Sequence, residues 1–204
     1  MKQSVKLSAA DCAQAVLSAL EEGVVLIPTD TVYGLAASLT AVERLFAIKG
    51  RPAGMPVALL VASVDEAKAL VDDWPREASL LAEAFWPGPL TMVLKCDAEL
   101  AKTLGAQDSL GIRVPALEGL RDLLALTGPL AVTSANPHAV QPLTQISEVE
   151  ALFAESLEQI SLLVDGGDCA DLVSSVVAVG PGSLTLLREG AIPAAALQSA
   201  IRQD

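Results

Sequence analysis

Apolar runs and helical stripes alternate along most of this chain. The segments Val24 to Ile27, Val57 to Val61 and Leu130 to Thr133 are short apolar runs, which are typical of strands buried on both faces. Other apolar residues recur at helical spacing, as between Val16 and Leu20, where Gly23 ends the pattern. This alternation predicts an α/β fold in which helices cover a sheet.

Capping residues and helix breakers predict where the helices begin. Ser63, with Glu66 three residues later, forms a capping box, and Ser8 with Asp11 has the same pattern. Pro75 suits the first turn of another helix. The predicted helices begin near Ser8, Thr40, Ser63, Pro75, Asp97, Leu117, Ser147 and Pro193.

The remaining strands come in two groups. Thr91 to Leu94 and Gly111 to Val114 lie on either side of a short helix. Three further candidates follow with no helix between the last two: Ile160 to Val164, Ser175 to Val179 and Leu184 to Leu187. We expect antiparallel pairs within this late group, which makes the sheet mixed.

Length and composition fit one globular domain. The chain has 204 residues, of which 52% are hydrophobic and 19% are charged, so it can bury a substantial core. No repeat, low-complexity segment or linker divides it. We therefore expect a single domain over residues 1–204, with a motif core of about residues 8–192 and a C-terminal helix over residues 193–203.

The charge balance disfavours a general nucleic-acid binder. Lys and Arg number 13 against 25 Asp and Glu, for a net charge of −12. Proteins that bind nucleic acid without sequence preference neutralise phosphates with many cations. We therefore expect the few cations near polar loops to bind a small anionic ligand, and any RNA contact to be weak or local.

The cysteines and the single histidine point away from a zinc site or a Cys/His nucleophile pair. Cys12, Cys96 and Cys169 lie far apart, with no CxxC spacing, and His138 is the only histidine. The odd number of thiols fits a reducing, cytoplasmic compartment. We expect no membrane contact, because no apolar run reaches the ~18 residues of a membrane span and the N-terminus has no apolar signal region.

Two cations near the first motif are candidate phosphate ligands. The run Val24 to Ile27 leads into a hydroxyl-rich segment, residues 28–35, and Lys49 and Arg51 follow. In an extended segment, side chains two residues apart point to the same face, so both cations can bind one anion. Alternatively, they are two surface cations that complete a helix C-terminus. Neither needs to lie in the core.

A second polar cluster follows a buried strand. Ser134 and Asn136 come directly after Leu130 to Thr133, at the end of a strand where open α/β sheets place ligands. Ser offers a hydroxyl and Asn offers both a donor and an acceptor. A plain Ser-Ala-Asn-Pro turn is the alternative.

These segments and others resemble, in order and spacing, successive motifs of the YrdC-like family. The resemblance covers the chain from about Val24 to Ile192. The six matching segments are residues 28–35, 49–52, 86–91, 112–115, 133–136 and 187–190.

The resemblance implies a YrdC-like domain, with a twisted mixed sheet, flanking helices and an open central cavity. It also implies the synthesis of threonylcarbamoyl-AMP and pyrophosphate from L-threonine, bicarbonate and ATP. Separate transferase proteins would then modify the adenosine beside the anticodon of tRNA. The chain ends soon after the last motif, so it resembles the short family form that lacks a C-terminal extension.

The resemblance also implies roles for individual residues. Lys49, Arg51, Ser134 and Asn136 would form the catalytic tetrad, and the last three would bind ATP together with Arg188. The threonine and carbamate side would comprise Thr31, Tyr33, Arg113 and Ser174. Bidentate pairing with a carboxylate suits Arg113, whereas Tyr33 as a core ring with a satisfied hydroxyl is the alternative. ATP chemistry implies Mg²⁺, and no protein metal site is expected.

Three positions depart from the family pattern. Leu60 stands where many long-form members have a histidine, Val173 replaces the proline of a Pro-Ser-Thr motif, and Ala178 replaces an acid. These changes affect the expected shape of the threonine pocket. We interpret His138 as a solvated loop residue.

Two other functions stay open. One is a non-catalytic RNA-binding maturation factor of the same fold, with Lys49, Arg51, Arg113 and Arg188 as a concave basic patch. The other is a paralogue that adenylates a different carbamate, similar to the YrdC-like domain of hydrogenase-maturation carbamoyltransferases. Those longer chains also have zinc-finger and acylphosphatase regions, which are not apparent here.

Overall fold

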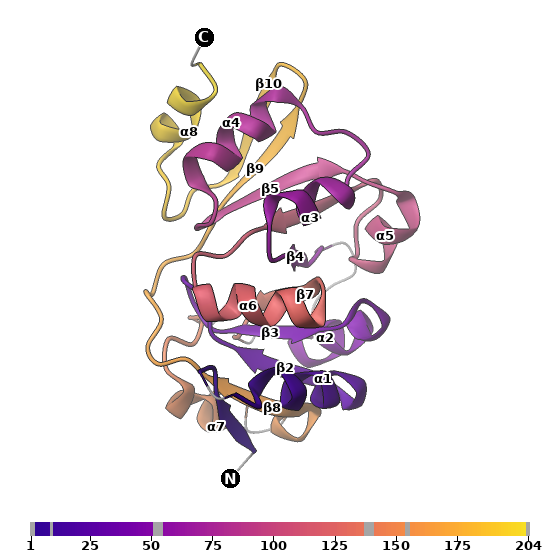
Figure 1. Ribbon diagram of the computed structural model, residues 1–204, viewed down its shortest axis with the longest axis vertical. Coiled ribbons are helices and arrows are strands. Elements are labelled where there is room, and N and C mark those ends of the chain that lie inside the picture. Colours follow the sequence, from indigo (N-terminus) through magenta and orange to yellow (C-terminus); the bar gives the residue numbers. More distant parts are fainter. Residues whose placement is uncertain (1–2, 9, 51–54, 137–140, 154–155, 203–204) are drawn as a thin grey trace.

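A long mixed sheet runs through the whole protein (Figure 1). The computed structural model describes residues 3–8, 10–50, 55–136, 141–153 and 156–202. Within them the strands follow the order β1-β8-β2-β3-β7-β4-β6-β5-β9-β10. They are β1 (Ser4–Lys6), β2 (Val24–Ile27), β3 (Gly34–Ala37), β4 (Ala58–Leu60), β5 (Leu90–Lys95), β6 (Ser109–Arg113), β7 (Leu130–Ser134), β8 (Ile160–Asp165), β9 (Ser175–Gly180) and β10 (Ser183–Arg188).

The pairing confirms the mixed sheet but corrects the expected late group of strands. β9 and β10 are antiparallel neighbours, as predicted. β8 instead lies between β1 and β2 and is parallel to both, whereas β9 is parallel to β5. The long segment after β8 carries the chain to the other half of the sheet, so sequence neighbours are not sheet neighbours here.

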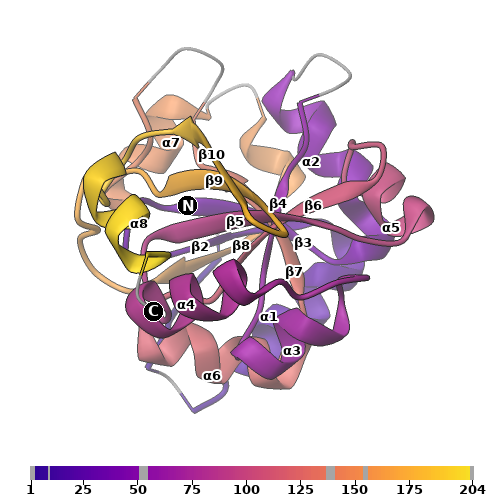
Figure 2. The same cartoon turned by 90° about the horizontal axis from the view of Figure 1, so that it is seen from above.

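Helices flank the strands on both sides. α1 and α6 pack on the smaller of two hydrophobic clusters, and α2, α3, α4, α5, α7 and α8 pack on the larger one; Figure 2 shows the helices arranged around the strands. The helices are α1 (Cys12–Glu22), α2 (Val42–Lys49), α3 (Val64–Ala69), α4 (Arg76–Phe85), α5 (Ala98–Thr103), α6 (Glu118–Thr127), α7 (Val149–Leu152) and α8 (Ala194–Ala200). Short 3₁₀ turns cover η1 (Leu39–Ala41), η2 (Ile146–Glu148) and η3 (Leu157–Gln159).

Local capping chemistry sets several helix starts as predicted. Ser63 Oγ accepts from Glu66 N at 3.2 Å, and Asp97 Oδ1 accepts from Glu99 N at 2.9 Å and Leu100 N at 3.2 Å. Each bond satisfies an N–H that the first helical turn leaves without a backbone partner.

Two predicted caps were wrong. The first helix begins at Cys12, and Ser8 lies before it. Leu7 N bonds to Asp165 O at 2.9 Å, which continues the pairing of β1 with β8 and keeps Ser8 out of the helix. Ser147 lies inside the 3₁₀ turn η2 rather than at the start of α7.

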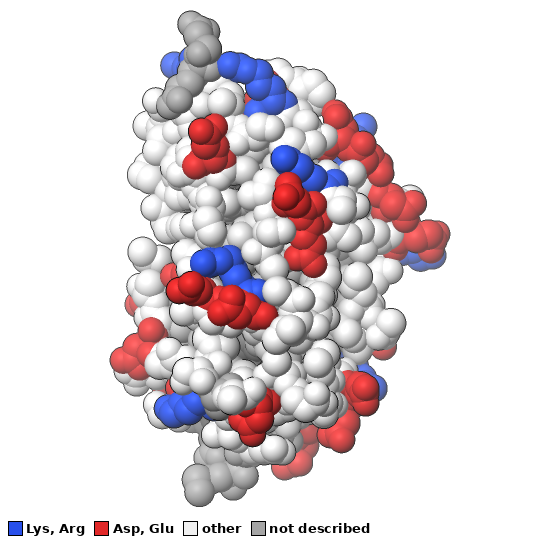
Figure 3. All heavy atoms as spheres, in the orientation of Figure 1, with Lys and Arg blue, Asp and Glu red and all other residues white. Residues whose placement is uncertain are grey.

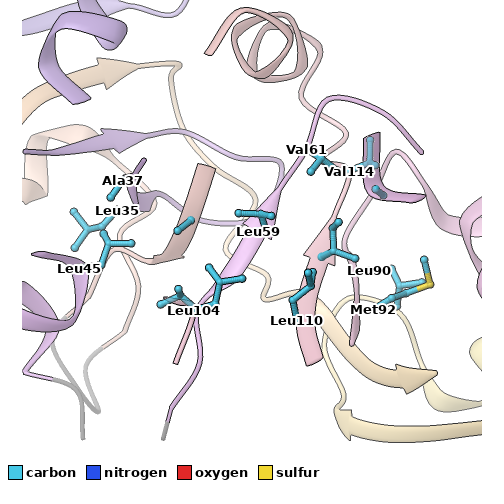
Figure 4. Close-up of a cluster of buried hydrophobic side chains, with 14 of the residues drawn as sticks. Leu35, Ala37, Leu45, Leu59, Val61, Leu90, Met92, Leu104, Leu110 and Val114 are labelled. Carbon is cyan, nitrogen blue, oxygen red and sulfur yellow. The ribbon is translucent and has the colours of Figure 1, made fainter. Parts of the chain in front are cut away.

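Alternating strand residues fill two hydrophobic clusters. In β2, Val24 and Leu26 belong to one cluster and Val25 and Ile27 to the other, because successive side chains of a strand point to opposite faces. The smaller cluster packs under α1 and α6. In the larger one, Leu59 of β4 lies centrally between side chains from the two halves of the sheet (Figure 4).

The same alternation leaves a cavity on one face of the sheet. In β6, Leu110 and Ile112 enter the core while Gly111 and Arg113 line the cavity. In β5, the large apolar side chains face the core and Thr91 faces the cavity. The sheet curves around this space without closing into a barrel, so the cavity stays open. No helix in the described part of the chain combines the length and apolarity that crossing a bilayer requires.

Candidate active site

An open cavity of about 310 Å³ brings the separated motifs together. Its polar lining comes from the loop before β3 and from strands in both halves of the sheet: Thr29, Thr31, Tyr33, Thr91, Ser109, Arg113, Thr133, Ser134, Ser174 and Arg188. Strand pairing explains part of this convergence, because Gly34 of β3 lies opposite Ser134 of β7. The volume is within the usual range for small-molecule sites.

Beside the lining residue Ser134, Lys49 connects two other predicted catalytic residues. Its ammonium donates to Ser134 O at 2.7 Å and Asn136 Oδ1 at 2.7 Å, and also contacts Asn136 O. Ser134 Oγ donates to the same Asn136 Oδ1 at 2.6 Å. The sequence placed these residues in two motifs, and the structure assembles them as one cluster.

The burial of Lys49 departs from the expectation that it need not lie in the core. Lys49 is only 6% exposed, so its charge depends on the surrounding oxygens for solvation. It is the last residue of α2, and Gly50 ends the helix in the left-handed region with φ 56°. Arg51, the second predicted cation, lies outside the described residues, as does His138.

Arg113, another lining residue, is held by three oxygens. Nε donates to Gly88 O at 2.9 Å and Nη1 to Thr31 Oγ1 at 3.0 Å. Nη2 lies 2.7 Å from Asp30 Oδ1, an ion pair whose alignment is not that of a hydrogen bond. Arg113 is 5% exposed, and this burial lowers its pKa.

A second arginine faces the same space. Arg188 donates from Nη2 to Ser174 Oγ at 2.9 Å and from Nε to Ser174 O at 3.0 Å. Desolvation, and then the charge of Arg113, lowers the pKa of Arg188. Ser174 Oγ also lies 3.0 Å from Thr91 Oγ1. Two guanidinium groups that line one cavity and repel each other favour an anionic ligand there.

Tyr33 was predicted to contact threonine, but its hydroxyl is bonded to the protein backbone. Its ring is buried, and its hydroxyl donates to Gly167 O at 2.8 Å and accepts from Gly166 N at 3.3 Å. Burial raises its pKa to about 12. Tyr33 thus lines the cavity while its hydroxyl anchors the segment that leads from β8 toward β9, which agrees with the alternative of a core ring with a satisfied hydroxyl.

Sequence reasoning missed two residues beside the predicted ones. Asp30 lies within the first motif, residues 28–35, and no role was predicted for it, although it pairs with Arg113. Ser175 is fully buried, and its Oγ donates to Ile192 O at 2.7 Å and accepts from the amides of Gly190 and Ile192. An acid directly before the pocket threonine was the available signal for Asp30. For Ser175 the signal was its place as the last residue of the segment that resembles the Pro-Ser-Thr motif, although that resemblance did not indicate its hydrogen-bond partners.

Two of the three departures from the family pattern fall at the cavity. Leu60 and Val173 line it, and Ala178 lies on β9 outside the lining. None of the described lining residues carries a carboxylate. Nor does the described part of the chain contain a group of three or more His, Cys, Asp or Glu side chains that could hold a metal.

Comparisons with known proteins give consistent matches. The family model Sua5_yciO_yrdC, described as "Telomere recombination", matches residues 18–190. The threonylcarbamoyl-AMP synthase of Pyrococcus abyssi is 35% identical over 189 residues, which cover 89% of this chain and 55% of that protein. The threonylcarbamoyl-AMP synthase of Bacillus subtilis is 32% identical over 197 residues, which cover 93% of this chain and 56% of that protein.

A solved structure matches to the same extent. The crystal structure of P. abyssi Sua5 complexed with L-threonine aligns with a TM-score of 0.88 and 31% identity, over 99% of this chain and 61% of that one. The chain therefore spans little more than half the length of these relatives.

Proposed function

This chain belongs to the Sua5/YciO/YrdC family, and from that premise we propose that it synthesises threonylcarbamoyl-AMP. Its substrates would be L-threonine, bicarbonate and ATP, and pyrophosphate would be the second product. The observation that carries the proposal is the convergence of the separated motifs on one cavity, which Arg113 and Arg188 line and whose Ser134 is bonded to Lys49. The relative with L-threonine bound supports the amino-acid substrate.

The proposed chemistry has two steps. The amine of L-threonine combines with bicarbonate to give a carbamate and water. A carbamate oxygen then bonds to the α-phosphorus of ATP, the bond to the bridging oxygen breaks, and pyrophosphate leaves with that electron pair. Negative charge increases on the phosphates during this step, so fixed cations in a sheltered cleft lower its barrier.

The residues fall into two proposed groups, one for the nucleotide and one for the threonine carbamate. We propose that Lys49, Ser134 and Asn136 contact the nucleotide, together with Arg51 and Arg188. Thr31, Arg113 and Ser174 would form the threonine and carbamate side. For Tyr33 the observed hydrogen bonds favour a supporting role, because both involve the backbone of residues 166–167.

Mg²⁺ is proposed as part of the ATP substrate. The described cavity lining offers hydroxyls and cations but no carboxylate, so it does not suit a resident metal. Mg²⁺ readily keeps water ligands while it binds phosphates, and it would enter with the nucleotide. We propose that separate transferase proteins then pass the threonylcarbamoyl group to tRNA, and that the reaction takes place in the cytoplasm. A single YrdC-like domain over residues 1–204 would carry it out.

The test is pyrophosphate release from ATP with bicarbonate and Mg²⁺, with and without L-threonine. We expect release that depends on threonine, together with a product of the mass of threonylcarbamoyl-AMP. Folded protein that releases no pyrophosphate with any amino acid would refute adenylate synthesis.

A second candidate is adenylation of a different carbamate. It is favoured by Leu60 and Val173, because both departures from the family pattern line the cavity. A panel of amino acids and of carbamoyl phosphate in the same assay separates the two functions. Faster release with another substrate than with L-threonine would favour this second candidate.

The RNA-binding alternative has less support. Of the four cations expected to form a basic patch, Lys49 and Arg113 are buried and bonded to protein oxygens. Arg188 is exposed, and Arg51 lies outside the described residues. Buried and paired cations contribute little to phosphate neutralisation.

A further inference from the structure

Asp30 lies next to the cavity without lining it. Thr29 and Thr31, its two neighbours, are among the lining residues, and so is Arg113. Asp30 reaches the cavity through Arg113, with Oδ1 2.7 Å from Nη2 and the two side chains 14% and 6% exposed. Apart from the electric field of its charge, this carboxylate therefore acts on a ligand through the guanidinium.

The hydroxyls beside Arg113 have a fixed hydrogen-bond direction. Thr29 Oγ1 donates its one proton to Val32 O at 2.7 Å, so in its 2.8 Å contact with Thr31 Oγ1 it must accept. Thr31 Oγ1 thus donates to Thr29 and accepts from Arg113 Nη1. Its proton is used, and only one lone pair remains for a ligand.

This side of the cavity therefore has a defined polarity. Arg113 has five N–H groups, and its contacts with Gly88 and Thr31 use two as hydrogen bonds, while Asp30 attracts the Nη2 end. The remaining N–H groups can donate to an acceptor such as a carboxylate. The remaining lone pair of Thr31 Oγ1 can accept from an N–H or O–H donor. An amino acid with its carboxylate and a neighbouring donor offers both partners.

We propose that Asp30 is a positioning residue: by holding Arg113 against Thr31, it fixes the donor and acceptor directions that bind the amino-acid end of the substrate. This inference rests on the proposed function, since it concerns the L-threonine side of the same cavity. It assigns to Asp30 a role in the binding geometry rather than in the chemical step.

The simple charge effect predicts the opposite result, which makes the proposal testable. Removing a negative charge beside a cavity that binds a carboxylate should tighten binding if Asp30 acts only through its field. Loss of positioning should weaken binding. Asp30→Ala removes both the charge and the acceptor, whereas Asp30→Asn removes the charge and keeps an acceptor oxygen for Arg113.

The experiment measures the calorimetric Kd of L-threonine for the whole protein and the KM values for L-threonine and ATP. For Asp30→Ala we expect Kd and the threonine KM to rise about tenfold, which corresponds to about 1.4 kcal/mol of binding free energy, because a guanidinium that is no longer held in place bonds less well to the ligand. Asp30→Asn should give a smaller rise. The KM for ATP should stay close to the wild-type value in both variants.

Asp65→Asn is the matched control, because Asp65 is 95% exposed and pairs with Lys68 on the surface. Unchanged or tighter threonine binding by folded Asp30→Ala would overturn the proposal, and so would equal rises in both KM values. Asp30→Asn, which keeps an acceptor for Arg113, supplies the same comparison if the alanine variant does not fold. Wild-type protein that binds no L-threonine would instead refute the proposed function itself.

Discussion

A single buried ammonium group connects two of the motifs at the residue scale. Lys49 ends α2, and its Nζ contacts both Ser134 and Asn136, which follow β7. The group is therefore structural as well as a candidate ligand of the nucleotide. An isolated Lys-x-Arg segment also fits an exposed helix end, and only the fold distinguishes the two.

Replacing Lys49 should affect both stability and activity. Lys49→Met keeps the aliphatic stem but leaves buried oxygens without their donor, so we expect the free energy of unfolding to fall by about 1–3 kcal/mol. Pyrophosphate release should fall by roughly 100-fold, because the cation would stabilise charge that increases in the transition state. Denaturant unfolding and initial rates measure the two effects. Lys68→Met, at a side chain 47% exposed, is the control, and a fully active Lys49→Met would contradict the assignment.

Tyr33 allows a direct titration, because it is the only tyrosine in the chain. Its pKa is raised to about 12, chiefly by burial, so the fold favours the neutral phenol. Ultraviolet absorbance of the phenolate should give a midpoint near 12 for folded protein and about 10 in denaturant. A folded-state midpoint near 10 would contradict the buried setting.

The same shift has a consequence for stability. Between pH 10 and 12 the unfolded chain loses the Tyr33 proton while the folded chain keeps it. The contribution of Tyr33 protonation to the free energy of unfolding is therefore complete below pH 10 and is lost as pH rises through 12. In that interval it should lower the free energy of unfolding by about 1.4 kcal/mol per pH unit. Tyr33→Phe should remove this part of the pH dependence, as measured by the difference between the two unfolding curves.

At the element scale, the end of α2 determines where the candidate phosphate ligand lies. Gly50 has φ 56°, and a Cβ added there would meet no atom within 4 Å. The requirement for glycine therefore comes from the backbone conformation rather than from space. A different end to this helix would move Lys49 away from Asn136.

We therefore expect Gly50→Ala to destabilise the protein by about 1 kcal/mol and to lower the rate of pyrophosphate release. Gly50→Asn should cost less, because Asn tolerates the left-handed region. Gly182 is the matched control, since it has φ 66° and equally open surroundings in the turn between β9 and β10. Equal losses of activity for Gly182→Ala and Gly50→Ala would contradict a specific role for the α2 end.

At the scale of the whole molecule, charge argues against general binding of RNA. The net charge is −12, and on the face in Figure 3 the basic side chains are scattered among acidic ones. Binding of labelled tRNA, followed by fluorescence anisotropy, should be weaker than about 10⁻⁴ M at physiological salt. Submicromolar binding that weakens steeply with added salt would instead support the RNA-binding alternative.

Strong local signals predicted most elements, and the two missed strands lie where such signals are weak. The apolar run of β2 was predicted with its observed bounds, and Asp97 caps α5 as expected. β1 and β3 were missed, because β1 has only three residues and β3 reads Gly-Leu-Ala-Ala, without the β-branched residues that favour strands. Both are held in the sheet by their neighbours.

By itself, the sequence determined the α/β class, the mixed sheet and the order of the motifs, because apolar periodicity, caps and breakers act over a few residues. Only the tertiary structure decided that Lys49 is buried, that the Tyr33 hydroxyl bonds to the segment after β8, and that Asp30 holds Arg113. Those facts depend on strand order, which joins residues far apart in the chain, and no local pattern encodes it.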